Sequence, residues 1–299
     1  MPGQLKEVRD RIASVKSTQQ ITKAMKLVAA SKLRKAQDRI VQMRPYSAKL
    51  YDMLRNIMAG GEGNLSAGYG AARPIQNVLI VVISSDRGLC GGFNANMVKL
   101  FKSTVEQKYK QAHQSGNITV LSVGKKAYEA LKKDKSLHFI TNHIDLFSRL
   151  SFEEAMQASE QIMKEFVDKK YDAVEVIYNQ FKNQITQLPT VEQFLPIEKL
   201  DTASTPEKES AERPDFIFLP NQENIIAELV PKILKTRFYR FLLDSNASEH
   251  GARMTSMDNA TNNAEDLLVA LNISYNRARQ AAITTELSEI VSGAAALQG

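Results

Sequence analysis

The sequence predicts a mixed α/β protein in which long N- and C-terminal helices pair as an antiparallel coiled coil and flank a central α/β domain. Two segments carry the helix prediction: Gln4 to Arg44 and Ala252 to Ser292 each run for about 41 residues without glycine or proline. Between them, short β-rich runs alternate with amphipathic segments. We therefore divide the chain into an N-terminal helix (1–58), an α/β domain (75–220) and a C-terminal helix (221–299).

The N-terminal helix has a heptad pattern at both of its ends. The apolar core positions are Leu5, Val8, Ile12, Val15, Ala29, Leu33, Ala36, Ile40 and Met43. In the same register, Gln19, Thr22 and Lys26 fall in the middle of the seam. A second apolar stripe begins there, at Ile21, Met25 and Val28. Either the packing stutters in this segment or a third surface contacts it.

The C-terminal helix carries one stripe of apolar and small residues at alternating spacings of three and four. Its members are Met254, Met257, Thr261, Ala264, Leu268, Leu271, Tyr275, Ala278 and Ala282. Past Tyr275 the apolar signal rotates to Ile283, Leu287, Ile290 and Val291. A solvated helix end would be polar, so we expect another protein to enclose this end. The alternative is a frayed, alanine-rich tail.

Charge is distributed unevenly along the chain, whose net charge is +6. Residues 1–57 carry thirteen Lys or Arg against four Asp or Glu, a net charge of about +9. From Ser245 onwards there are three basic residues against six acidic ones, about −3. The two terminal helices therefore attract each other. The remaining positive face suits nucleic acid, anionic lipid or an acidic protein surface.

Composition excludes several classes of protein. The N-terminus has no apolar signal region, and no apolar run is long enough to span a bilayer, which indicates a cytosolic or peripheral protein. The single cysteine, Cys90, excludes an internal disulfide. The four histidines, His113, His138, His143 and His250, show no metal-ligand spacing. We expect neither a metal nor a cofactor.

The central region predicts a largely parallel, Rossmann-like sheet covered by helices. Strands are expected at Val78–Ser84, Ile118–Val123 and Ala173–Tyr178, with another near Phe216–Leu219. Helices are expected around Ala95–Lys110, Lys125–Lys133 and Phe152–Lys169. The polar segment Asp201–Pro214 is expected to be an exposed turn.

The loop SSDRGLCGGFN, from Ser84 to Asn94, is the stretch most like a chemical motif. Its glycines follow a buried strand, as in a phosphate-binding loop, but both the Gly-Lys-Ser/Thr ending and the G-x-G-x-x-G spacing are missing. Cys90 lies near Arg87, and a neighbouring cation would favour a reactive thiolate. Without an acid or histidine assigned to it, Cys90 is first interpreted as a small packed residue.

Three stretches resemble the gamma subunit family of F-type ATP synthases. They are TQQITKAMKLVAASKLRKAQ (Thr18–Gln37), the loop SSDRGLCGGFN, and ARMTSMDNATNNAEDLLVALNISYNRARQAAITTELSEIVSGAAAL (Ala252–Leu297). Because they lie at the beginning, middle and end, the resemblance covers the whole chain. It implies a bacterial form, and the regulatory cysteine pair of chloroplast forms is missing.

The resemblance also implies a role. The paired helices would form the central rotor shaft inside a ring of three alpha and three beta subunits, and the body would join epsilon and the membrane c-ring. Catalysis would belong to beta. The protein would lie peripherally at the cytoplasmic face of the bacterial cell membrane and take part in proton-driven ATP synthesis or in hydrolysis.

The resemblance further implies which residues contact partners and couple rotation to catalysis. They are Met25, Lys26, Cys90, Glu249, Arg253, Arg279 and Gln280. Met25 and Lys26 would face the acidic levers of beta, and Arg279 with Gln280 would form a polar catch higher on the shaft. The alternative class is a coiled-coil protein that binds nucleic acid or a membrane surface through its basic first helix, with affinity that falls steeply with salt. A nucleotide-dependent enzyme would need a complete phosphate loop or an acid and base pair, and neither is present.

Overall fold

The computed structural model describes residues 2–59, 68–70, 73–197 and 222–298. The chain forms two compact units, Met1–Ala30 with Arg253–Gly299, and Ser31–Ala252. The first is the terminal helix pair, and the second is the α/β body together with the adjoining parts of both helices. The earlier division into 1–58, 75–220 and 221–299 stays a prediction.

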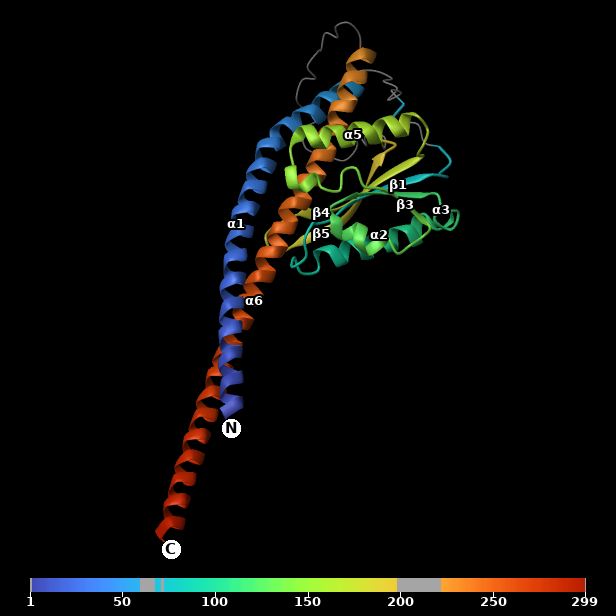
Figure 1. The fold of residues 1–299 in the computed structure, drawn as a ribbon. Helices are drawn as coiled ribbons and strands as arrows, with labels where there is room; N and C mark the ends of the chain where they lie inside the picture. The colour runs from blue at the N-terminus through green and yellow to red at the C-terminus, as the bar shows by residue number, and fades with distance from the viewer. Residues whose placement is uncertain (1, 60–67, 71–72, 198–221, 299) are drawn as a thin grey trace. The chain divides into compact units, whose positions relative to one another are not determined.

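Both terminal helices extend beyond the two segments that lack glycine and proline (Figure 1). Helix α1 spans Pro2–Ala59 and helix α6 spans Gln222–Gln298, so each continues through a proline, Pro45 and Pro231 respectively. A proline inside a helix removes one hydrogen bond and crowds the preceding turn. Burial of apolar neighbours offsets this cost: Leu50 and Leu54 follow Pro45, and Val230 and Leu234 lie beside Pro231. Packing therefore supports both helices at positions where the local preference of proline disfavours a helix.

The terminal helices of the first unit pair antiparallel. The Lys26 ammonium lies 2.5 Å from an Asp258 carboxylate oxygen, the Thr22 and Thr261 hydroxyls are 2.9 Å apart, and the Arg9 guanidinium donates to the Tyr275 hydroxyl at 3.1 Å. From one pair to the next, the residue number falls on α1 while it rises on α6. The two helices therefore run in opposite directions. The predicted coiled coil is confirmed.

The seam also settles the middle of α1. Thr22 is buried and Gln19 and Lys26 are half-buried in the heptad register, whereas Ile21 and Val28 are each 57% exposed. The stutter alternative is therefore wrong, because the register passes unbroken through polar positions. On α6, every member of the predicted stripe from Met254 to Ala282 is buried or half-buried. The second apolar stripe of α1 faces outwards.

The body contains one five-stranded sheet in the order β3-β2-β1-β4-β5. The strands are β1 (Val78–Ile83), β2 (Ile118–Val123), β3 (Leu137–Ile140), β4 (Ala173–Phe181) and β5 (Gln187–Leu195). All neighbours pair in parallel except β4 and β5. The fully buried β1 is the expected apolar run of a covered parallel strand. This arrangement confirms the predicted Rossmann-like sheet.

Two strands were missed in the sequence. Strand β3 has four residues, and β5 contains Pro189 and is half-buried along most of its length. Short and mixed strands give little periodic signal, and proline is confined to edges and bulges of a sheet. The predicted strand near Phe216–Leu219 and the turn at Asp201–Pro214 lie outside the described residues.

Helices cover both faces of the sheet. Helices α2 (Phe93–Lys108), α3 (Lys110–Gln114) and α4 (Lys125–Leu131) share one apolar cluster with β1 and β2. Helix α5 (Phe152–Val167), preceded by a short 3-10 helix at Leu146–Arg149, lies on the opposite face (Figure 1). Phe241 of α6 also packs there, 4.7 Å from the ring of Tyr178. The body is therefore a three-layer α/β sandwich whose second helical layer includes part of α6.

Candidate functional site

Met25 and Lys26 lie on α1 in the terminal helix pair. Met25 is half-buried, and the Lys26 side chain is 33% exposed while it holds the ion pair with Asp258. The family resemblance implies that Lys26 pairs with acids of another subunit, and this stays a prediction. In the described chain Lys26 pairs with an acid on the partner helix. The signal that would have found Asp258 is the antiparallel register, in which the numbers of facing residues have a nearly constant sum.

The outer face of α1 beside these residues is apolar. Ile21, Leu27 and Val28 are 57%, 66% and 57% exposed in the described structure. Exposed apolar residues scattered singly are ordinary, but three within one helical stretch mark a surface suited to a partner. This stretch gives the helix pair a side that differs from its charged remainder.

Three predicted coupling residues lie on α6 in the same unit. Arg253 is half-buried, whereas Arg279 and Gln280 are exposed. Beyond them, Ile283, Leu287, Ile290 and Val291 are between 49% and 67% exposed. This end of α6 extends past the first residues of α1, and no other described helix lies beside it (Figure 1). The C-terminal end is thus an uncovered apolar helix within the described chain.

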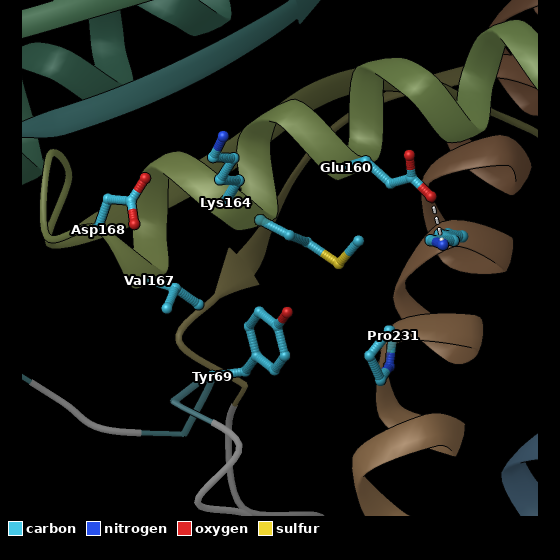
Figure 2. Close-up of a pocket in the computed structure, with 8 residues that line it drawn as sticks. Tyr69, Glu160, Lys164, Val167, Asp168 and Pro231 are labelled. Atoms are coloured by element: carbon cyan, nitrogen blue, oxygen red, sulfur yellow. Dashed lines mark hydrogen bonds and ion pairs between the residues drawn. The ribbon is translucent and has the colours of Figure 1, made fainter.

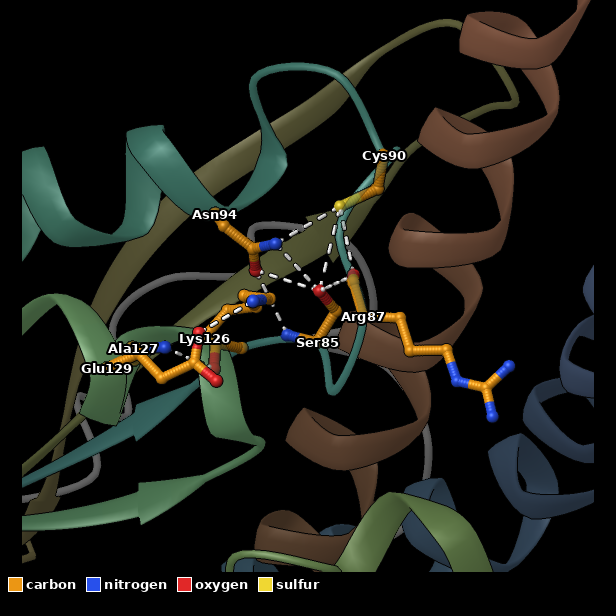
Figure 3. Close-up of polar contacts among 8 residues, drawn as sticks. Ser85, Arg87, Cys90, Asn94, Lys126, Ala127 and Glu129 are labelled. Atoms are coloured by element: carbon orange, nitrogen blue, oxygen red, sulfur yellow. Dashed lines mark hydrogen bonds and ion pairs between the residues drawn. The ribbon is translucent and has the colours of Figure 1, made fainter.

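The loop after β1 is held by a small polar cluster (Figure 3). The Ser85 hydroxyl donates to the Arg87 carbonyl at 2.7 Å, and the Asn94 amide contacts the Ser85 hydroxyl at 2.7 Å and the Cys90 sulfur at 3.2 Å. Cys90 is 1% exposed, and the Arg87 side chain points away from it. The interpretation of Cys90 as a packed residue is confirmed, and the cation needed for a reactive thiolate is turned elsewhere.

Helix α6 covers the place where this fold class binds ligands. In a doubly wound sheet that place is the carboxyl edge at the point where strand order reverses, here between β1 and β4. The Ser248 hydroxyl of α6 donates to the carbonyl of Asn179, near the end of β4, at 3.1 Å. At Gly251 an added Cβ would lie 3.2 Å from the Gln184 carbonyl. The sequence lacks a phosphate loop, and α6 lies against the carboxyl end of β4 and the turn that follows it.

Glu249 lies in the same stretch of α6 and is 7% exposed. His250 beside it is 8% exposed. A buried carboxylate must have compensating partners, so Glu249 is held by its surroundings and does not project freely into solvent. The structure places the predicted coupling residues in both units: Cys90 and Glu249 in the body, and the others in the helix pair.

A surface pocket of about 340 Å³ lies in the helical layer that contains α5 and part of α6 (Figure 2). Its lining is Tyr69, Glu160, Met163, Lys164, Val167, Asp168, Pro231 and Lys235. Glu160 of α5 and Lys235 of α6 join across its wall at 2.6 Å. The pocket thus combines apolar side chains with charged ones, of which Glu160 and Lys235 pair with each other. In the described residues no group of three or more His, Cys, Asp or Glu has an arrangement suited to a metal ion.

Comparison with known proteins assigns the family. The model of the ATP synthase family matches residues 4–297. The ATP synthase gamma chain of Cytophaga hutchinsonii is 53% identical over 298 residues, which cover 99% of each chain. This chain belongs to the ATP synthase gamma chain family. The gamma chain of Chlorobaculum tepidum, 43% identical over 296 residues, covers 98% of this chain and 99% of its own length.

Solved structures agree on the fold of the gamma chain family. A chain of the Euglena gracilis mitochondrial ATP synthase, in an assembly with OSCP, F1 and c-ring, matches with a TM-score of 0.66 at 21% identity. The match covers 99% of this chain and 95% of the other. A chain of the Tetrahymena thermophila central stalk and c-ring matches with a TM-score of 0.57 at 24% identity, over 80% and 99% of the two chains. The terminal helix pair and the Rossmann-like body are therefore the gamma-chain fold.

Proposed function

We infer that this chain is the central-stalk rotor subunit of a bacterial F1Fo ATP synthase and that catalysis resides on the beta subunits. Membership of the gamma chain family over residues 4–297 carries the inference. The helix pair supports it, because a rotor shaft must be elongated and must present different surfaces on its different sides. The contact of α6 with the carboxyl end of β4 is also compatible with catalysis on another subunit.

Coupling in such a machine is a difference in binding free energy. Each rotation angle of the shaft must bind one conformation of the surrounding ring better than the others. A shaft with equal contacts at all angles would transmit nothing. The exposed apolar side of α1 at Ile21, Leu27 and Val28, beside charged faces, supplies the required asymmetry.

The partners follow from this role. The helix pair would contact the ring of alpha and beta subunits, and the body would join epsilon and the c-ring. Met25, Lys26, Cys90, Glu249, Arg253, Arg279 and Gln280 are proposed as the coupling and contact residues. The exposed apolar end of α6 fits an enclosing sleeve of the ring. Nucleic acid is not among the proposed partners.

The complex would be peripheral at the cytoplasmic face of the bacterial membrane. No helix in the described ranges has both the length and the apolar composition to cross a bilayer. Membrane association would therefore come through the c-ring and would support proton transport coupled to ATP synthesis. Coupling of the basic α1 to acidic levers also accounts for its charge better than nucleic-acid binding does.

Reconstitution tests the proposal directly. The chain is mixed with alpha and beta subunits, the complex is isolated, and its stoichiometry and ATPase turnover are compared with those of the free chain. We expect one copy per three alpha–beta pairs, with hydrolysis only in the complex. Failure to join the ring, or hydrolysis by the free chain, would overturn the proposal.

Arg253 tests the coupling assignment. Arg253→Glu is expected to reduce proton-driven ATP synthesis in membranes more than it reduces assembly, because the site would act on the ring conformation. Arg277→Glu is the matched control, since Arg277 is an exposed basic residue of the same helix outside the proposed set. Equal losses of assembly and synthesis for Arg253→Glu would count against a coupling role.

A further inference from the structure

One helical layer of the body is rich in lysine. Residues 93–140 contain nine lysines, no arginine and three acidic residues. The lysines are Lys99, Lys102, Lys108, Lys110, Lys125, Lys126, Lys132, Lys133 and Lys135. Their net charge with the acids is about +6, as large as that of the entire chain. The rest of the chain sums to about zero, because the charge of about +9 on residues 1–57 is balanced by acidic residues outside both segments.

Most of these lysines have no acidic partner. Lys108, Lys125 and Lys126 form ion pairs with Glu175, Asp145 and Glu129. The other six are exposed and make no ion pair within the part of the chain that the structure describes. These six, called here the lysine face, are Lys99, Lys102, Lys110, Lys132, Lys133 and Lys135. Their charge is directed to solvent or to a partner.

The lysine face lies on a single side of the sheet. Its residues come from α2, α3 and the segment from α4 to β3, and these helices share one core cluster with β1 and β2. Helix α5, on the other side, has four glutamates and one lysine, a net charge of about −3. Helix α5 is therefore acidic, whereas the layer formed by α2, α3 and α4 on the other face of the sheet is basic. A uniformly solvated surface does not require such a separation.

We propose that the lysine face attracts the anionic headgroups of the membrane next to which the complex turns. This inference rests on the proposed function, which sets the body beside the c-ring. Each lysine near an anionic membrane adds a favourable increment to binding, and the attraction reaches about one Debye length, roughly 10 Å. Six unpaired lysines are enough for a measurable attraction.

Lysine chemistry favours lipid over an acidic protein as the partner. Protein interfaces are enriched in arginine, which binds carboxylates through two parallel hydrogen bonds, and are depleted in lysine. The lysine face has no arginine. Flexible point charges suit a diffuse anionic layer. A fluid layer also attracts the body equally at every angle, so it sets no rotational barrier, which a rotor requires.

Vesicle sedimentation tests the proposal. The isolated complex of this chain with alpha and beta subunits is mixed with vesicles of phosphatidylcholine alone or of phosphatidylcholine with phosphatidylglycerol. In this complex the basic helix pair lies inside the ring, so the body dominates binding. We expect binding to the anionic vesicles only, weakening as salt rises.

Charge-matched variants locate the binding surface. Changing the six residues of the lysine face to glutamine is expected to weaken anionic-vesicle binding by at least about tenfold. The control changes six other exposed lysines of the same unit, again without ion pairs among the described residues: Lys32, Lys35, Lys49, Lys164, Lys169 and Lys182. It removes the same charge and should weaken binding much less.

The outcomes separate this proposal from the rotor function. Equal weakening by both variants would mean a general charge effect and would overturn it. Unchanged vesicle binding with weakened epsilon binding would assign the lysine face to an acidic protein instead. If both variants assemble with alpha and beta yet wild-type complex ignores anionic vesicles, the lipid proposal fails while the rotor function stands. Failure of the wild-type chain to assemble with alpha and beta would count against the rotor function itself.

Discussion

Glu175 shows how one residue stabilises the body. It lies on the interior strand β4, is 1% exposed, and accepts hydrogen bonds from the Lys108 ammonium at 2.9 Å and the Tyr109 hydroxyl at 2.8 Å. Burial and the hydrogen bond to this carboxylate raise the pKa of Tyr109. The carboxylate satisfies two donors that converge from the layer of α2 and α3.

Removing that carboxylate should destabilise the body. Glu175→Ala leaves the buried Tyr109 hydroxyl without its acceptor, so we expect a loss of about 2–4 kcal/mol in the free energy of unfolding. Glu175→Gln keeps an acceptor oxygen and should lose less. Urea unfolding followed by circular dichroism measures both, with the exposed Glu106→Ala as control. A glutamine variant as unstable as the alanine variant would contradict this account.

Asp244 makes stability depend on pH. Burial raises the pKa of this α6 carboxyl from 3.8 to about 6, while Arg240 and Arg44 oppose the rise and Glu192 adds to it. A raised folded-state pKa means that the folded protein binds the proton more tightly than the unfolded chain. The contribution of Asp244 to stability is therefore greatest below pH 4 and is lost as pH rises through about 6.

Asp244→Asn should therefore stabilise the protein near neutral pH. We expect a gain of about 3 kcal/mol at pH 7 that falls below about 1 kcal/mol by pH 4, because the amide never acquires the charge. Urea unfolding at several pH values measures the difference between variant and wild type. Asp52→Asn, at an exposed position of α1, is the control. A gain that stays constant from pH 7 to pH 4 would exclude this cause.

At the scale of elements, the helix pair is specified by register. Apolar and small residues repeat along both helices, and polar pairs fill the middle of the seam without interrupting it. The repeat predicted the partner faces correctly. The register placed Thr22 and Lys26 in the seam but did not show that polar side chains are accommodated there, because this depends on Thr261 and Asp258 on the other helix.

The Lys26–Asp258 pair separates seam packing from coupling. Both side chains are about one-third or more exposed, so breaking the pair should cost less than about 1 kcal/mol. If Lys26 also contacts a beta lever, Lys26→Gln should reduce coupled ATP synthesis more than Asp258→Asn does. Synthesis rates in membranes, normalised to assembled complex, measure this. Identical effects of the two changes would confine Lys26 to the seam.

The missed strands show where element prediction ends. Strand β5 reads as a polar segment with a proline, and only pairing with β4 along Val174–Phe181 makes it a strand. Its residues are half-buried because an edge strand has a neighbour on one side. Long-range pairing of this kind leaves no periodic trace in the local sequence.

At the scale of the whole molecule, stability should differ along the chain. In the free chain, α6 beyond Ala282 has no partner helix among the described residues, whereas β1 is buried on both faces. We therefore expect amides of 283–295 to exchange with solvent fastest and those of Val78–Ile83 slowest. Hydrogen exchange measured by mass spectrometry resolves the two segments.

The same measurement on the assembled complex reports on the C-terminal end. If the ring encloses the apolar end of α6, amides of 283–295 should become protected by at least about tenfold while those of Val78–Ile83 stay unchanged. Protection that is absent in an active complex would favour the alternative of a frayed tail. Arg279 and Gln280, one turn earlier, would then lose their proposed place inside the ring.

The sequence by itself determined the two long helices, their apolar faces, the parallel strands β1, β2 and β4, and the packed state of Cys90. These features are written in local periodicity and composition, which act over a few residues. Only the tertiary structure decided which buried side chains support both helices at Pro45 and Pro231, that α6 lies against the carboxyl end of β4, and that Lys26 meets Asp258. Each of these features depends on burial or pairing between residues far apart in the chain. The free energy of these contacts exceeds the local conformational preference, and no single segment of the sequence reveals it.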